Sequence, residues 1–121
     1  MTDSDMDAIL RRLLALVAKA GLPGVEESTS YGRPALKVGG RAFVSVRNGE
    51  TIVLSLPIED KEHLIEMAPD IYYQTDHYRG WPSLPLWAAA IGDDELQQRL
   101  VEAWRFRAPR KVIAAFDARQ S

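Results

Sequence analysis

The fold is decided by residues 35–56, which read ALKVGGRAFVSVRNGETIVLSL. Apolar and polar side chains alternate along this stretch, and two turn dipeptides interrupt it, Gly39-Gly40 and Asn48-Gly49. Alternation with a period of two is typical of β-strands, and both dipeptides suit two-residue hairpin turns because they tolerate a positive φ. We therefore predict three consecutive antiparallel strands here, and a strand over residues 25–31 completes a four-stranded meander.

Two-residue turns also predict the register, because directly opposed residues share one face of a sheet. The predicted pairs are Leu36 with Phe43, Phe43 with Leu54, and Arg47 with Glu50. The core face then consists of Leu36, Val38, Phe43, Ile52, Leu54 and Leu56. The opposite face holds Val44, Val46 and Val53, together with Ala35, Lys37, Ala42, Thr51 and Ser55. This second face is either an open surface of good strand formers, or is half-covered by the C-terminus, or meets a protein partner or a second copy.

Helices and further strands flank the meander. Apolar side chains at helical spacing over residues 6–20, ended by Gly21 and Pro23, predict a first helix, and residues 59–68 predict a short one. Residues 71–78 and 84–91 predict two strands, and two last helices begin near Asp93 and Pro109. The order α-β-meander-α-β-β-α-α predicts a single two-layer α+β domain over residues 1–121. Its antiparallel sheet has five to six strands, and helices stand at both chain ends.

Composition excludes several classes of protein. With 121 residues, 46% of them hydrophobic and 26% charged, the chain is of ordinary globular type. It contains no cysteine, which rules out thiol nucleophiles, disulfides and Cys-based zinc sites. Residues 1–7 are acidic where a signal peptide is basic, and no apolar stretch approaches the roughly 20 residues that span a bilayer. We expect a cytoplasmic protein without a membrane partner.

Charge is unevenly distributed along the chain. The net charge is −2, yet residues 99–119 carry six basic and two acidic side chains. This segment is either a solvated helix face or a surface for an anionic partner. The candidate phosphate contacts are Arg105, Arg107, Arg110 and Lys111 in the C-terminal segment, with Arg33, Lys37 and Arg79 from the hairpin and aromatic regions.

Half of the ten aromatic residues lie between positions 72 and 87. They are Tyr72, Tyr73, Tyr78, Trp81 and Trp87, and His77 and Arg79 stand among them. Aromatic rings beside a guanidinium can stack on bases, but strands also select aromatic residues for packing, so both interpretations stay open.

Several strings in this order resemble the MmcQ/YjbR family of small bacterial proteins. They are LPGVEE at 22–27, YGRPALKVGGRAF at 31–43, TDHYRGWP at 75–82, and the tail residues Glu95-Leu96, Ala103-Trp104 and Ala108-Pro109. The resemblance implies a two-layer domain with helices on one face of an antiparallel sheet. It also implies a DNA-binding label, which rests on similarity to a double-wing domain of a viral transcription factor. No residue-level active site comes with the family.

No catalytic motif stands beside these candidates. His63 and His77 lack metal-ligand spacing, no Gly-x-Ser-x-Gly string exists, and the glycine pairs lack the lysine of a phosphate loop. We therefore expect a non-enzymatic binding module without a metal or a cofactor. Its partner is expected to be DNA, held by salt-sensitive and weakly sequence-specific phosphate contacts. The alternative is a protein partner or a second copy, held through Val44, Val46 and Val53.

Overall fold

The computed structural model describes residues 2–120, with side chains from Asp5 onward. Within this range the chain forms an antiparallel five-stranded sheet and helices at both ends, which confirms the predicted α+β class. The helices are α1 (Thr2–Ala20), α2 (Ile58–Met67), α3 (Asp93–Arg107) and α4 (Arg110–Gln120), with a 3-10 helix, η1, at Asp76–Tyr78. The strands are β1 (Val25–Ser30), β2 (Arg33–Val38), β3 (Arg41–Val46), β4 (Thr51–Ser55) and β5 (Ser83–Trp87), which lie in sequence order across the sheet.

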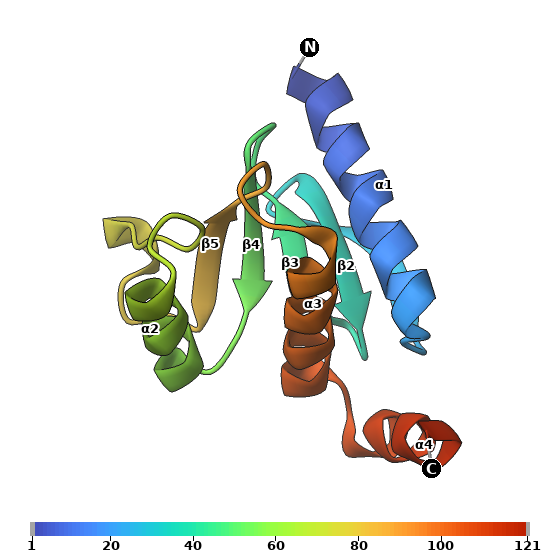
Figure 1. Ribbon diagram of the computed structural model, residues 1–121. Helices are drawn as coiled ribbons and strands as arrows, with labels where there is room; N and C mark the ends of the chain where they lie inside the picture. Colours follow the sequence, from blue (N-terminus) through green and yellow to red (C-terminus); the bar gives the residue numbers. More distant parts are fainter. Residues whose placement is uncertain (1, 121) are drawn as a thin grey trace.

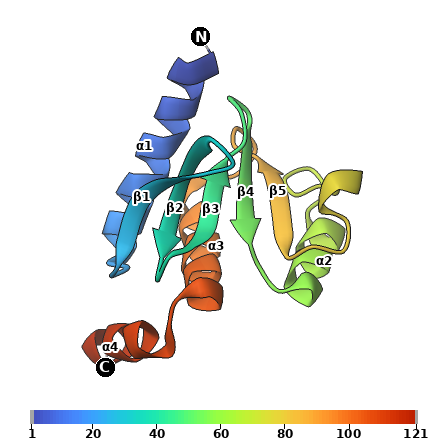
Figure 2. The same cartoon turned by 180° about the vertical axis from the view of Figure 1, so that it is seen from behind.

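The two faces of the sheet differ in what covers them. Helices α1 and α3 pack on one face, whereas Figure 2 shows the opposite face with no described helix across it. Helix α2 lies beside β5, and α4 extends past the end of α3 (Figure 1). The largest fully buried side chains include Leu13 of α1, Trp104 of α3 and Phe43 of β3. The core therefore lies between the sheet and the pair α1 and α3.

The turn between β2 and β3 forms as predicted, but a bulge follows it. Gly39 and Gly40 have φ values of 59° and 79°, and Val38 pairs with Arg41. Lys37 then pairs with Ala42 while Leu36 pairs with Val44, so β3 contains one extra residue, Phe43. In such a bulge two successive side chains oppose one partner residue. This explains why Phe43 and Val44 are both buried in the core.

The turn between β3 and β4 is one residue longer than predicted. The Asn48 side-chain oxygen accepts hydrogen bonds from the backbone N–H groups of Glu50 (2.8 Å) and Thr51 (2.9 Å). The N–H of Arg47 donates to the carbonyl of Thr51 at 2.9 Å, so Arg47 faces Thr51 rather than Glu50. Gly49 does not have a positive φ, because the Asn48 side chain closes the loop in place of a two-residue turn.

The predicted face assignment is therefore wrong for two of the three valines. Val44 pairs with Leu54 and Val46 with Ile52, and both valines are buried in the core beneath the helices. A one-residue shift of register moves side chains to the other face, and here the bulge and the longer turn cause that shift. Val53 keeps its predicted place on the open face, although only 8% of it is exposed.

The strand predicted over residues 71–78 is absent from the structure. A single bridge joins Tyr72 to Leu86, flanked by hydrogen bonds from Tyr73 N–H to the Pro85 carbonyl and from Trp87 N–H to the Ile71 carbonyl. Pro85 has no N–H to donate to the Tyr73 carbonyl in exchange, so strand pairing along this edge of β5 stops there. The chain instead turns into η1 and crosses toward the open face.

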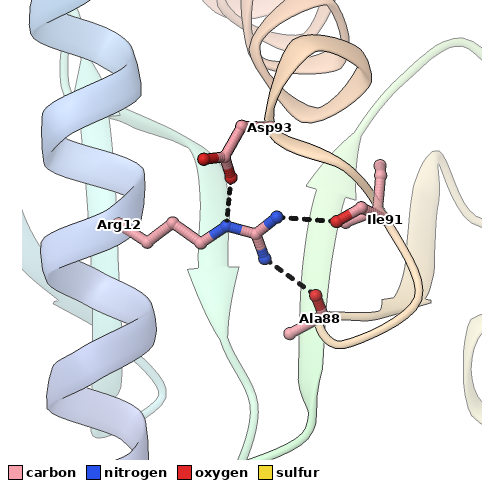
Figure 3. A network of polar contacts seen from close by, with 4 residues as sticks. All are labelled: Arg12, Ala88, Ile91 and Asp93. Atoms are coloured by element: carbon pink, nitrogen blue, oxygen red, sulfur yellow. Dashed lines mark hydrogen bonds and ion pairs between the residues drawn. The ribbon is translucent and has the colours of Figure 1, made fainter.

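Arg12 joins α1 to the loop that enters α3 (Figure 3). Its guanidinium donates to Asp93 Oδ1 at 2.7 Å and to the carbonyls of Ala88 and Ile91 at 2.7 and 2.6 Å. All three partners lie about 80 residues away along the chain, so this one side chain fixes the two covering helices relative to each other.

Candidate functional site

A groove of about 660 Å³ lies on the open face of the sheet. Its volume falls in the range of ordinary ligand sites, roughly 300–1,000 Å³. All five strands, the β1–β2 turn and the segment around η1 contribute residues to it. The lining residues are Ser30, Tyr31, Arg33, Ala42, Val44, Ser45, Arg47, Val53, Ser55, His77, Tyr78, Trp81 and Ser83.

Small side chains form the floor of the groove. Ser45 and Val53 are paired across β3 and β4, so they share the open face. Ser55 lies further along β4, and its hydroxyl donates to the carbonyl of Ala42 at 3.1 Å. These residues leave room above the sheet where larger side chains would fill it, and their hydroxyls offer hydrogen-bonding groups to a ligand.

One wall of the groove is residues 75–82, held in place by a buried lysine. Lys61 of α2 is 1% exposed, and its Nζ donates to the carbonyls of Tyr78 (2.6 Å) and Trp81 (2.9 Å). Burial lowers the pKa of Lys61, and nearby Arg79 lowers it further against the opposite effect of Glu62. The Thr75 hydroxyl accepts from the Tyr78 N–H at 3.3 Å and caps η1. The wall is therefore fixed by interactions with the body of the domain.

The opposite wall is the turn between β1 and β2. Tyr31 has a φ of 53°, a conformation that is uncommon for any residue other than glycine, and Gly32 follows with 77°. The Tyr31 residue is 97% exposed, so no packing of its ring explains its presence there. A strained and exposed aromatic residue is a reason to suspect a functional role.

The charge of the groove is wholly basic. Arg33, Arg47 and His77 line it, and none of the lining residues is acidic. Arg33 and Arg47 each lie two residues from the paired Ala35 and Ser45, which places Arg33 in β2 and Arg47 just past the end of β3 on the same face. The Arg47 guanidinium lies 5.3 Å from the centre of the Tyr78 ring. Like charges side by side on a sheet are destabilising, so an anion bound there would relieve this repulsion.

Of the residues predicted to contact phosphate, only Arg33 lines the groove. Lys37 lies on the same face but pairs with Glu26 of β1, outside the lining. Arg79 belongs to the wall segment but is absent from the lining, and it is exposed and forms an ion pair with Asp76 at 3.1 Å. The structure therefore separates these three residues, although all come from the region of the open face.

The remaining predicted contacts, Arg105, Arg107, Arg110 and Lys111, form the basic tail. Arg105 makes two hydrogen bonds to Asp117, at 2.7 and 3.3 Å. Arg107 is half-buried with its guanidinium 4.6 Å from the Phe106 ring centre, and burial lowers its pKa, as does nearby Arg41. Arg110 and Lys111 are exposed in the first turn of α4.

The tail and the Tyr31 turn lie at opposite ends of β2. A Cβ atom added to Gly39 would stand 2.7 Å from Cγ of Pro109, so the β2–β3 turn touches the start of α4. Strand β2 runs from Arg33 to Val38, a length of about 17–20 Å for six residues. The basic tail does not line the groove, and the structure does not combine the predicted contacts into one surface.

Sequence reasoning missed Arg47 as a groove residue because it placed Arg47 opposite Glu50. The available signal was Asn48, whose side chain favours a turn closed by its own oxygen. His77, Tyr78 and Trp81 stood in the aromatic stretch noted in the sequence, and the structure brings all three to the groove.

Within residues 2–120 no three His, Asp or Glu side chains are grouped as metal ligands. No helix in the described part of the chain combines the length and apolar character needed to cross a bilayer.

Comparison with known proteins identifies the family of this chain. Residues 20–106 match the sequence model of the YjbR family. Over 55 residues the chain is 34% identical to uncharacterized proteins of Mycobacterium tuberculosis, strains H37Rv and CDC 1551, and of Mycobacterium bovis. These matches cover 46% of this chain and 43% of each relative, which is less than half of either length. No solved structure gives a significant match. Because the family match runs from the end of α1 through all five strands and most of α3, this chain belongs to the YjbR family.

Proposed function

We propose that this chain is a non-enzymatic nucleic-acid-binding module that holds the phosphate backbone in the groove of its open sheet face. One observation carries the proposal. The chain has 17 acidic and 15 basic residues, yet the groove is lined by Arg33, Arg47 and His77 and by no acid. Phosphate is the anion that a planar guanidinium matches with two hydrogen bonds.

Such contacts fix position more than sequence. Arginine bonds to phosphate release counterions, so the affinity should fall steeply with salt and depend weakly on base sequence. Arg110 and Lys111 are exposed and can add a second, weaker contact at the far end of the sheet. The groove remains the principal site, because Arg105 is engaged by Asp117 and Arg107 is half-buried.

The groove also holds residue types that occur in catalytic sites. Serine hydroxyls and His77 share the groove, but no hydrogen bond joins them among the described residues. A nucleophile activated by a base needs that contact, at about 2.6–3.2 Å.

A protein-interaction module is the alternative that the sequence raised. Two of its three residues, Val44 and Val46, are buried in the core at 2% and 0% exposed, so their side chains offer almost no surface to a protein partner, although Val44 also lines the groove. The apolar face that motivated this alternative is therefore much smaller than expected, and nucleic acid fits the charge of the groove better.

The proposal is tested by binding across a salt series. A double variant, Arg33→Ala with Arg47→Ala, is compared with Arg11→Ala with Arg119→Ala, which removes the same charge from exposed helical positions outside the groove. Fluorescence anisotropy with labelled single- and double-stranded oligonucleotides of mixed sequence gives the affinity.

We expect the groove variant to lose at least about tenfold in affinity and to lower the salt slope by roughly 1.4 to 1.8, the value for two lost phosphate contacts. The control should change little. Equal losses in both variants would show a general charge effect, and no binding to either oligonucleotide at low salt would refute the proposal.

A further inference from the structure

We infer that the groove takes a single strand rather than a duplex, with bases stacked on Tyr31 and Trp81 and the backbone on Arg33 and Arg47. This inference rests on the proposed function and names the form of nucleic acid. Its basis is that two large aromatic residues border a basic groove with their surfaces open, 97% for Tyr31 and 64% for Trp81.

Both aromatic residues are presented by fixed backbone. Tyr31 occupies the turn between two paired strands, and Trp81 has its carbonyl bonded to Lys61 Nζ and its N–H bonded to the Tyr78 carbonyl at 3.0 Å. A platform already held in place loses little conformational freedom when a ligand binds. The exposed rings of Tyr31 and Trp81 can therefore stack on bases at a small cost in conformational entropy.

Aromatic faces can be used by unpaired bases and not by a duplex. In a duplex the bases cover one another and present only their edges in the grooves. Proteins that hold single strands combine a basic channel for the backbone with aromatic side chains on which bases stack. This groove has both elements, with hydroxyls of Ser45 and Ser55 on its floor near any base that enters.

The placement of the helices agrees with this choice. The major groove of a duplex admits a helix or a two-stranded ribbon. Helices α1 and α3 lie on the covered face of the sheet, away from the groove (Figures 1 and 2). Two hairpin turns adjoin the groove, the β1–β2 turn and the projecting β3–β4 turn next to Arg47 (Figure 2), so a duplex held by one of these turns is the competing outcome.

The test uses variants that remove a ring without disturbing the fold. Asparagine tolerates a positive φ far better than tyrosine, so Tyr31→Asn suits the turn while it removes the ring. Trp81→Leu removes the second ring and Trp81→Phe keeps one. Met67→Ala, at a residue of α2 that is 69% exposed and lies outside the groove, is the control for loss of an exposed apolar side chain. Circular dichroism checks that each variant folds.

Affinity is measured for a single-stranded oligonucleotide and for its own duplex. We expect tighter binding of the single strand, a loss of about 5- to 150-fold for Tyr31→Asn and for Trp81→Leu, and a small change for Trp81→Phe. Tryptophan fluorescence should be quenched on binding, and Trp81→Phe should remove most of that quenching, because Trp104 is buried and Trp87, stacked on Tyr73, does not line the groove.

Three results would overturn the inference, and they are distinguishable. Duplex bound as tightly as single strand, or ring variants with unchanged affinity while Arg33→Ala with Arg47→Ala abolishes binding, would refute the single strand and leave the proposed function standing. Absence of binding to both forms would refute the two together.

Discussion

The chain has two basic regions, and they differ in how much of their positive charge is available to bind an anion. In the basic tail four cations lie within seven residues of sequence, yet Arg105 is bonded to Asp117 and Arg107 is half-buried against Phe106. In the groove the two arginines and His77 come from three separate segments, and no acidic residue lines the site with them. A high density of charge in sequence therefore does not mean that the charge is available. The fold engages part of the tail and gathers scattered cations into a site.

The largest expected effect separates the tail from the groove. Phe116 is 5% exposed and meets the buried Trp104 ring edge-on at 5.1 Å between ring centres, so it anchors α4 to α3. Phe116→Ala should lower the free energy of unfolding by about 3 kcal/mol, through lost burial and the cavity that remains. Urea denaturation followed by circular dichroism gives this value.

Groove affinity, measured on the folded variant, should stay within about twofold of the parent, because no residue of α4 lines the groove. A large loss of nucleic-acid binding in Phe116→Ala would mean that the tail belongs to the site, and the contrast between the two regions would fail.

Lys61→Met should weaken binding, which Phe116→Ala should not. It should also cost less stability than Phe116→Ala. Methionine has a similar length and no charge, so the change removes the donor of the Tyr78 and Trp81 carbonyls and little volume. Leaving two carbonyls without this donor should lower the free energy of unfolding by about 2 kcal/mol. Unlike Phe116→Ala, it should also weaken binding by about tenfold or more, since the wall with His77 and Trp81 is no longer fixed.

The comparison of the two variants is made at equal folded fraction. If Lys61→Met loses stability but binds as the parent does, the wall at residues 75–82 is not part of the binding surface, and only the cations of the strands remain as the site.

The sequence predicts the elements well and their register poorly. Periodicity and turn residues locate α1 and the four strands of the meander within a few residues, because these signals are local. The face of Val44 and Val46 depends on one extra residue at Phe43 and one at the Asn48 loop, and each such residue reverses the faces that follow it. The strand predicted at residues 71–78 fails for a reason outside that segment, which is the missing N–H of Pro85 on the neighbouring strand.

The site was less predictable than the fold for the same physical reason. Arg33 was found because basic residues near a hairpin are visible in sequence, and the rings of Tyr78 and Trp81 were noted as one candidate use of an aromatic stretch. Their convergence with Arg47 depends on tertiary contacts, above all the bonds from Lys61 to the wall, which no local pattern encodes. The availability of the tail arginines to phosphate was overestimated, because Asp117, the partner of Arg105, lies twelve residues further along the chain on the next helix.

The smallest expected effect tests whether the tail charge is engaged within the protein. The hydrogen bond from Arg105, with its positive charge, lowers the pKa of the Asp117 carboxyl, and the same contact raises the pKa of Arg105. Because the folded pKa of Asp117 lies below its unfolded value, the contact adds stability above the unfolded pKa and loses it as the pH falls through the folded pKa. Both side chains are largely exposed, so the change in stability should be small.

The pKa of Asp117 itself is the sharper measurement. NMR titration of its carboxyl carbon should give a value below the ordinary range of aspartate, and Arg105→Ala should move it back toward that range. Groove affinity should not change in this variant. An Asp117 pKa that is the same with and without Arg105 would show that the pair does not form in solution. Arg105 would then be as available to an anion as Arg33. Arg107 would be the one cation of the basic tail still engaged within the described protein, and the contrast with the groove would rest on it.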